Sequence, residues 1–183
     1  ELPAVVDDGN LRWDDLRFPA QSINPAGTTA PPTVVTDENG YTGCLSFAGN
    51  ADNAVSGVAQ MPHAWSRGTA IKPHLHWTKP TGSASAVTWE LYYRVLGSPG
   101  DVAGAWVGPI TATILAGNQQ VSNQHLISSF GEVSMTGLKE SACINWRLYR
   151  RGSTDADNNA VVLTEFDIHY QADKNGTVEE IPS

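Results

Sequence analysis

One stretch decides the fold class of this chain: Val87-Thr88-Trp89-Glu90-Leu91-Tyr92-Tyr93-Arg94-Val95. Large apolar side chains recur at every second residue of this stretch, and polar side chains fill most of the alternate positions. Because successive side chains of a β-strand point to opposite faces, a period of two predicts a strand with one buried face. The same alternation predicts strands over residues 143–149 and 161–170.

Shorter runs predict further strands over residues 44–47, 55–61, 71–77, 110–115 and 126–135, the last with Gly131 as a bulge or bend. Clusters of glycine, proline, asparagine, aspartate and serine separate these runs, and no window combines a helical period with helix caps. The sequence therefore predicts an all-β domain, a jelly-roll-like antiparallel β-sandwich of about eight strands. A closed barrel is the alternative, which the unequal strand lengths and irregular links disfavour.

The 183 residues fit one domain with an extension at each end. Residues 1–32 carry five of the 11 prolines and show no sustained alternation, which predicts an extended N-terminal arm outside the sheets. Residues 33–171 then form the β-sandwich, and residues 172–183 form a C-terminal tail. The arm has large side chains that need a surface to dock on, so we expect contacts with another subunit or a capsid at Trp13, Leu16, Arg17 and Phe18.

The charge balance excludes several classes of partner. Charged residues make up 16% of the chain, against about 25% in an average soluble protein, and the net charge is −8. Nucleic-acid binding relies on Lys and Arg neutralising phosphates, so no nucleic-acid partner is predicted. No apolar run approaches the roughly 18 residues of a membrane span, and the N-terminus lacks a signal-peptide layout, so we expect a soluble protein without a membrane partner.

The two cysteines, Cys44 and Cys143, lie far apart in strand-like runs. Two cysteines at this spacing make neither a disulfide framework nor a metal knuckle. The sequence therefore predicts two buried thiols, with a disulfide between them as the alternative.

A His-x-His pattern lies in the predicted strand over residues 71–77. His74 and His76 would share one strand face, so their imidazoles could converge on a metal ion. Gly-x5-His-x-His also opens the first cupin motif, but the glutamate that this motif requires is missing, and so is a second motif. We therefore expect packed, hydrogen-bonded histidines and no cofactor, and we keep a cupin-like metalloprotein as an alternative, with candidate ligands His74, His76, His169 and His63.

No catalytic residue is predicted. The chain has no Gly-x-Ser-x-Gly elbow, phosphate loop or dinucleotide fingerprint. Glu165, Asp167 and His169 share one strand face and could form an acid–base pair or a metal site, but polar residues are ordinary on an outward strand face. The sequence thus favours a protein that is not an enzyme.

Six tryptophans raise the possibility of sugar binding, since aromatic faces stack on sugar rings. Trp89 and Trp146 lie on the apolar faces of predicted strands and are expected in the core. Trp65 and Trp106 lie in loop-like segments and are the candidate ligand contacts.

Four stretches carry a resemblance to a known group: Trp13-Asp14-Asp15-Leu16-Arg17, Gln60-Met61-Pro62-His63-Ala64-Trp65, Pro73-His74-Leu75-His76-Trp77 and Glu165-Phe166-Asp167-Ile168-His169-Tyr170-Gln171. Together, in this order, they resemble small virion structural proteins of tailed bacteriophages and prophages. The resemblance implies a phage particle component without catalysis, similar to capsid decoration or cement proteins, which are commonly trimeric. It carries over no functional residue.

The favoured function is accordingly a structural one. We expect a non-enzymatic cement protein on the exterior of the virion, assembled in the host cytoplasm, a homotrimer that contacts the major capsid protein or other virion proteins. One alternative is a head or tail appendage protein that binds carbohydrate on the host surface. The other is the cupin-like metalloprotein that uses the His-x-His strand.

Overall fold

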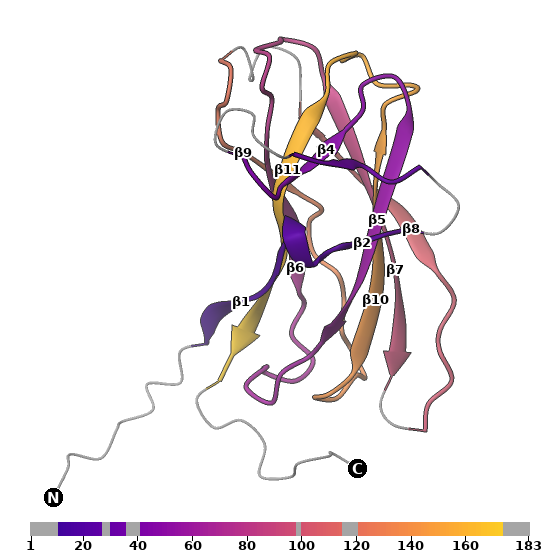
Figure 1. The fold of residues 1–183 in the computed structure, drawn as a ribbon. Helices are drawn as coiled ribbons and strands as arrows, with labels where there is room; N and C mark the ends of the chain where they lie inside the picture. The colour runs from indigo at the N-terminus through magenta and orange to yellow at the C-terminus, as the bar shows by residue number, and fades with distance from the viewer. Residues whose placement is uncertain (1–10, 27–29, 36–40, 98–99, 115–120, 174–183) are drawn as a thin grey trace, which may run out of the picture.

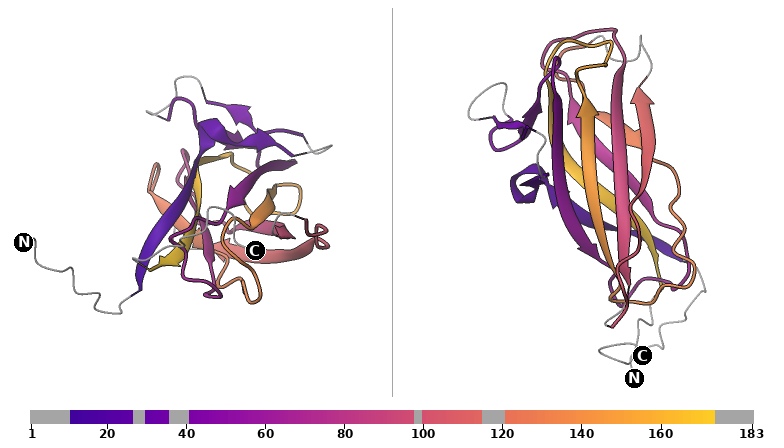
Figure 2. Two further views of the ribbon diagram at one scale, coloured as in Figure 1. Left: turned by 90° about the horizontal axis from the view of Figure 1, so that it is seen from below. Right: turned by 90° about the vertical axis from the view of Figure 1, so that its right-hand side faces the viewer.

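In the computed structural model, which describes residues 11–26, 30–35, 41–97, 100–114 and 121–173, two antiparallel sheets pack face to face (Figures 1 and 2). This confirms the predicted all-β sandwich. The described residues contain one 3₁₀ turn, Ala20–Ser22, and no α-helix. No helix in this part of the chain is long and apolar enough to cross a membrane.

The first sheet, sheet A, has the order β3-β4-β11-β6-β9, and β1 also pairs with β11. Its strands are β1 (Arg12–Pro19), β3 (Thr33–Val34), β4 (Leu45–Phe47), β6 (Lys72–Thr78), β9 (Leu126–Ser129) and β11 (Val161–Ala172). β4 pairs with the beginning of β11 and β1 pairs with the rest, so the two strands share one edge of β11.

The second sheet, sheet B, has the order β2-β5-β10-β7-β8. Its strands are β2 (Asn24–Pro25), β5 (Asp52–Gln60), β7 (Val87–Gly97), β8 (Val107–Ile114) and β10 (Cys143–Arg151). Buried and half-buried residues alternate without exception along β10, as expected of a central strand with one face on the core. The three strands with the clearest period of two in the sequence are thus β7, β10 and β11.

The N-terminal segment differs from its prediction. Residues 12–19 do not form an arm outside the sheets, because they pair along β11 in an antiparallel register from Arg12↔Ala172 to Pro19↔Glu165 (Figure 1). The short strand β2 also lies in the segment predicted as the arm, and it pairs with β5. The prolines at 19 and 25 each end their strands, where the missing N–H is tolerated. Residues 1–10 and 27–29, and residues 174–183 of the predicted tail, lie outside the described residues.

Aromatic side chains fill the space between the sheets. Trp89 of β7 contacts Phe47 and Trp77 edge to face, with ring centroids 5.0 and 5.8 Å apart. Trp146 of β10 packs against Phe166 at 4.4 Å. The predicted core positions of Trp89 and Trp146 are confirmed.

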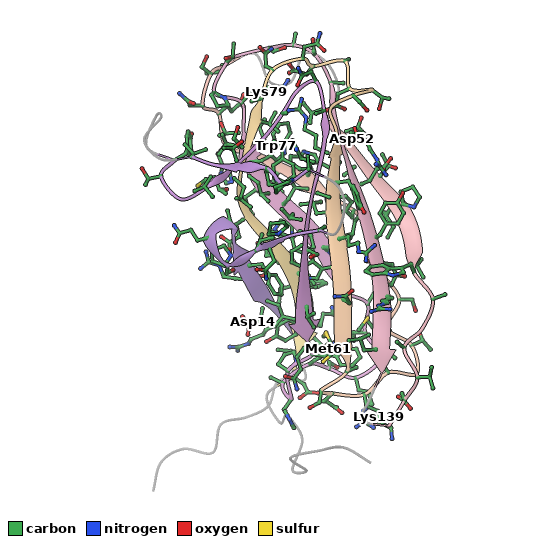
Figure 3. The ribbon with its side chains drawn as sticks, turned by 45° about the vertical axis from the view of Figure 1, so that its right-hand side comes forward. Asp14, Asp52, Met61, Trp77, Lys79 and Lys139 are labelled. Atoms are coloured by element: carbon green, nitrogen blue, oxygen red, sulfur yellow. The ribbon has the colours of Figure 1, made fainter. Side chains whose placement is uncertain are left out.

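The core continues along the sandwich between Met61 near one end and Lys79 near the other (Figure 3). At the Lys79 end, buried charges replace apolar side chains. The Nζ atom of Lys79 lies 2.5 Å from Oδ2 of Asp157, and both side chains are almost fully buried. Burying two charges this deeply is tolerated only when they are paired and hydrogen-bonded.

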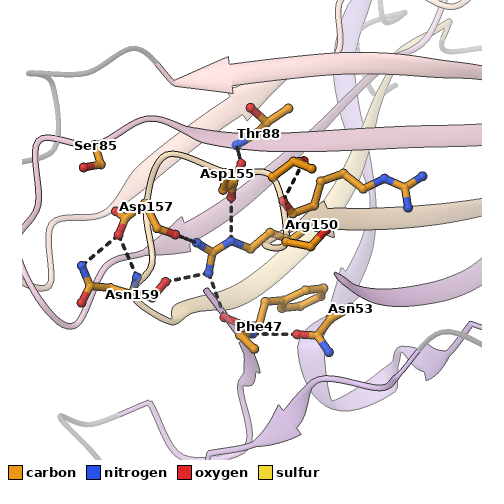
Figure 4. Close-up of polar contacts among 12 residues, drawn as sticks. Phe47, Asn53, Ser85, Thr88, Arg150, Asp155, Asp157 and Asn159 are labelled. Atoms are coloured by element: carbon orange, nitrogen blue, oxygen red, sulfur yellow. Dashed lines mark hydrogen bonds and ion pairs between the residues drawn. The ribbon is translucent and has the colours of Figure 1, made fainter. Parts of the chain in front are cut away.

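Arg150 is the centre of this polar end (Figure 4). Its Nε donates to Oδ2 of Asp155 at 2.9 Å, and its two Nη atoms donate to the carbonyl oxygens of Phe47, Asp157 and Asn159 at 2.8 to 2.9 Å. Oδ1 of Asp155 accepts the backbone N–H of Thr88 at 2.8 Å. One fully buried guanidinium therefore ties the β10–β11 loop to both sheets.

Both cysteines are free. Cys44 and Cys143 are half-buried, so the prediction that both thiols are buried is wrong. Burial raises the pKa of the Cys44 thiol.

Candidate functional site

The outer face of sheet A collects charged and aromatic side chains from three strands. We call this set the histidine face: Trp13, Asp15 and Arg17 of β1, Lys72, His74 and His76 of β6, and Glu165, Asp167 and His169 of β11. The residues between them, such as Leu75 and Phe166, are fully buried against the core. The period of two thus places every member on the side of the sheet that faces away from the core.

Strand register brings these side chains together. Asp167 pairs with His74 on β6 and with Arg17 on β1, and His169 pairs with Lys72 and with Asp15. Residues directly opposite each other in antiparallel strands have their Cβ atoms close enough for side-chain contact. The histidine face is therefore a product of strand pairing, since its members come from distant parts of the sequence.

Asp167 lies at the centre of the histidine face. Its Oδ1 atom is 2.7 Å from Nε2 of His74, its Oδ2 atom is 3.2 Å from Nε2 of His76, and the two Nε2 atoms are 3.1 Å apart. The side chains of Asp167 and His74 are only 6% and 8% exposed. Oδ1 is buried, and its close partner is Nε2 of His74.

Three further residues, His125, His169 and Asp15, extend the cluster outward. Nδ1 of His76 lies 2.7 Å from Nε2 of His125, and the two rings are stacked. Nε2 of His169 lies 3.0 Å from Oδ1 of Asp15, while the His169 ring meets that of His74 edge to face at 4.1 Å. Four imidazoles and two carboxylates form one continuous network.

The two imidazoles beside Asp167 have opposite pKa shifts. Burial lowers the pKa of both, because a desolvated imidazolium is unfavourable. For His74, contact with Asp167 and its negative charge outweigh burial and raise the pKa. For His76, burial outweighs the attraction of Asp167, and the charges of His74 and His125 lower the pKa further.

Trp13 provides an exposed aromatic surface at the edge of the histidine face. Its side chain is 48% exposed, Nζ of Lys72 lies 4.7 Å from its ring centroid, and the ring is 6.3 Å from that of His169. A hollow of about 210 Å³ lies on the same face, lined by Lys72, His74, Ile127, Ser129 and His169.

The four residues predicted as subunit or capsid contacts divide between the two faces of β1. Phe18 and Leu16 pack on the core of their own domain, and the Phe18 ring is 5.3 Å from that of Trp146. Arg17 forms a two-pronged ion pair with Glu165 at 2.5 and 2.7 Å, on the same face as Trp13. Contact of these residues with another subunit or a capsid stays a prediction.

Of the two tryptophans predicted as ligand contacts, Trp65 is buried. Its side chain is 1% exposed, and its Nε1 donates to Oγ1 of Thr69 at 3.0 Å, so the prediction of an accessible Trp65 is wrong. The segment that carries it folds back onto the core, and loop position alone does not reveal this. Trp106 is half-buried, with the guanidinium carbons of Arg147 and Arg94 at 4.3 and 5.1 Å from its ring centroid.

The structure brings three of the four candidate metal ligands together, namely His74, His76 and His169. His63 lies elsewhere, with its Nε2 3.4 Å from Oγ of Ser141. Sequence reasoning missed Asp15 and His125. For Asp15 a signal exists, because Trp13, Asp15 and Arg17 alternate with Leu16 and Phe18 as in a strand, whereas an isolated histidine such as His125 carries no signal.

No family model matches this chain, and no curated protein matches it. Among solved structures, a family 35 carbohydrate-binding module from Clostridium thermocellum is similar, with a TM-score of 0.54 and 8% identity over 85% of this chain and 97% of that chain. A family 35 module from Cellvibrio japonicus Abf62 has a TM-score of 0.48 and 6% identity, covering 87% of this chain and 99% of that one. The enzymatically active domain of bacteriophage CBA120 tailspike protein 4 has a TM-score of 0.41 and 9% identity, covering 87% and 19%. The first of these similarities establishes that the chain has the β-sandwich fold of such a module, and at this identity it establishes the fold alone.

Proposed function

We propose that this protein is a non-enzymatic recognition module that binds carbohydrate through its histidine face, with Trp13 as the stacking platform. The observation that carries the proposal is the exposed ring of Trp13 on the same face as a hollow that polar side chains such as Lys72 and Ser129 help to line. An aromatic face stacks on the C–H groups of a sugar ring. Binding sites typically combine such an apolar surface with a few placed polar groups.

The polar groups beside Trp13 suit sugar hydroxyls. Lys72 is a donor, Asp15 is an acceptor and Ser129 can act as either. Asp15 and Lys72 lie on strands of the sheet, and their positions are held by the register of β1, β11 and β6. Groups on a rigid sheet lose little conformational freedom on binding, which favours affinity for a small ligand.

A binding role also fits the burial of Asp167, one of the residues considered above as part of an acid–base pair. The carboxylate of Asp167 is almost fully buried beneath His74 and His76. A general acid or base has to reach the proton it transfers on a substrate. We therefore propose that Asp167 organises the histidine face and does not react with a ligand.

We further propose that the module works as a head or tail appendage of a phage particle, which rests on the resemblance of the four sequence stretches. The cement function, which the sequence favoured, loses one supporting argument, because residues 12–19 pair along β11 and are not a free docking arm. The homotrimer, the capsid partner and the location on the virion exterior stay predictions.

A glycan-array screen with full-length protein tests the proposed function. We expect binding to at least one glycan class, loss of that binding in Trp13→Ala, and retention in Trp106→Ala, which alters the outer face of sheet B instead. Thermal unfolding of both variants checks that each is folded. Loss in Trp106→Ala with retention in Trp13→Ala would place the site on sheet B and refute the proposed face, and silence of the wild-type protein across the array would refute carbohydrate binding.

A further inference from the structure

We propose that the centre of the histidine face binds one divalent transition-metal ion of the zinc class, with His74, His76, Asp167 and His169 as ligands. The inference is independent of carbohydrate binding. The sequence favoured packed histidines without a metal, and this proposal differs from that expectation. The reason is the position of Asp167, whose closeness to the imidazole rings cannot be predicted from the sequence. Three lines of geometry support it.

The first is the spacing of the ligand atoms. Nε2 of His74, Nε2 of His76 and the carboxylate oxygens of Asp167 are separated by 2.7 to 3.2 Å. Two ligands bound to zinc at about 2.1 Å in tetrahedral geometry lie about 3.4 Å apart. His169 completes the set, since His74, Asp167 and His169 offer ligand atoms that all lie within 4.8 Å of one another. Small side-chain adjustments, which widen the short separations and bring His169 closer, would fit this cluster around an ion.

The second is the unsatisfied oxygen. Oδ1 of Asp167 is buried, and the contact with Nε2 of His74 at 2.7 Å does not have the geometry of a well-aligned hydrogen bond. Buried polar atoms in proteins nearly always have a partner, and a buried carboxylate oxygen without one is unfavourable. A cation between Oδ1 and the ring nitrogens would satisfy it.

The third is the arrangement of outer partners. Asp15 contacts Nε2 of His169 and leaves its Nδ1 for a ligand. His125 contacts Nδ1 of His76 and leaves Nε2 facing Asp167. Metal-binding histidines are characteristically oriented in this way, with the second ring nitrogen held by a carboxylate, a carbonyl or another polar group.

The chemistry of the ligands selects the metal. Imidazole nitrogens suit Zn²⁺, Ni²⁺, Co²⁺ and Cu²⁺, whereas Mg²⁺ and Ca²⁺ prefer oxygen ligands. The hollow lined in part by His74 and His169 provides access from solvent. The two cations on this face are paired elsewhere, Lys72 with Glu132 at 3.2 Å and Arg17 with Glu165 at 2.5 Å. A bound ion would link β6 to β11 and, through Asp15, to β1.

Isothermal titration of ZnCl₂ into untagged full-length protein, freed of metal with a chelator and then dialysed, tests the proposal. We expect one Zn²⁺ per chain, a melting temperature that rises with Zn²⁺ concentration, and no response to Mg²⁺. His169→Gln and His74→Gln should each weaken binding at least tenfold, and Asp15→Asn should weaken it about 10- to 100-fold through the outer partner. His63→Gln, which alters a histidine outside the cluster, should leave it unchanged.

Absence of stoichiometric Zn²⁺ binding by the wild-type protein would overturn the proposal. So would equal binding by wild-type, His74→Gln and His169→Gln proteins, since the ion would then lie elsewhere. If His74→Gln does not fold, the His169→Gln and Asp15→Asn results decide, because both of these side chains are about two-fifths exposed and tolerate substitution. Glycan binding is measured separately, so either proposal can fail without the other.

Discussion

His74 and Asp167 lie directly opposite each other on β6 and β11, with 2.7 Å between Nε2 and Oδ1. Their contact depends on strand register, because a slip of one residue would turn either side chain to the other face of the sheet. β1 extends the same register, which places Asp15 beside His169 and Trp13 at the edge. One pairing pattern thus creates both the proposed sugar platform and the proposed metal site.

Removing the Phe18 side chain should test whether β1 belongs to the domain. Phe18→Ala would leave a gap beside Trp146 and Phe166, and we expect a loss of about 2 to 4 kcal/mol in the free energy of unfolding. Urea unfolding monitored by tryptophan fluorescence measures it. Leu11→Ala, at an exposed site just before the strand, is the control and should change little. Equal stability of both variants would mean that β1 contributes nothing to the core.

Loss of the buried guanidinium of Arg150 should be among the most damaging substitutions. Arg150→Met would leave Asp155 as an uncompensated buried charge and three carbonyl oxygens without their donor. We expect destabilisation by about 3 to 5 kcal/mol. Arg12→Met, at an exposed position of β1, should cost less than about 0.5 kcal/mol. A mild effect of Arg150→Met in chemical denaturation would contradict the role assigned to this residue.

The Lys79–Asp157 pair offers a double-mutant test. Either single change, Lys79→Met or Asp157→Leu, leaves a buried charge without its partner, so each should be strongly destabilising. The double variant should be less damaging than the sum of the two, because no charge remains unpaired. Unfolding free energies of all four proteins provide the coupling energy. Strict additivity would show that the two charges do not interact.

Stability should depend on pH through Glu140. The hydrogen bonds from Arg67 lower the pKa of Glu140 against the effect of burial, and the charge of His63 lowers it further. Because the pKa is lower in the folded state, the stabilisation is complete above the unfolded-state pKa of about 4.3 and is lost as the pH falls through the folded-state pKa.

Glu140→Gln should therefore be less stable than the wild-type protein at pH 7, and the difference should narrow as the pH falls below about 4.3. Urea unfolding at a series of pH values measures this. Glu132→Gln is the matched control, because Glu132 is largely exposed and its ion pair should contribute little. A constant difference at all pH values would contradict the assignment to the Glu140 carboxylate.

The sequence by itself predicted the central strands of both sheets and which side chains share a strand face. Val87 to Val95 predicted β7 from its period of two, and the same reasoning placed Trp89 and Trp146 in the core. It also placed His74 with His76 and Asp167 with His169 on common faces. These properties are local, because the alternation of side chains follows from the backbone conformation of each strand alone.

The prolines concealed the strand over residues 12–19. Sequence reasoning gave weight to the proline content of residues 1–32, whereas the alternation of Trp13 and Arg17 with Leu16 and Phe18 is the signal of β1. An edge strand tolerates a proline at its end, so the two observations do not conflict. The prediction that Trp65 is accessible was wrong for a different reason. A position in a loop does not determine whether a side chain points to solvent or to the core.

Only the tertiary structure decided which strands are neighbours. The contact of His74 with Asp167 requires β6 to pair with β11 in one register, and that of Asp15 with His169 requires β1 on the other side of β11. Pairing between distant strands is set by the packing of both sheet faces and by the whole topology, for which a local pattern has no signal. The sequence therefore determined which side chains share a face of each strand. Long-range packing decided which strands lie side by side, and so which side chains meet in the histidine face.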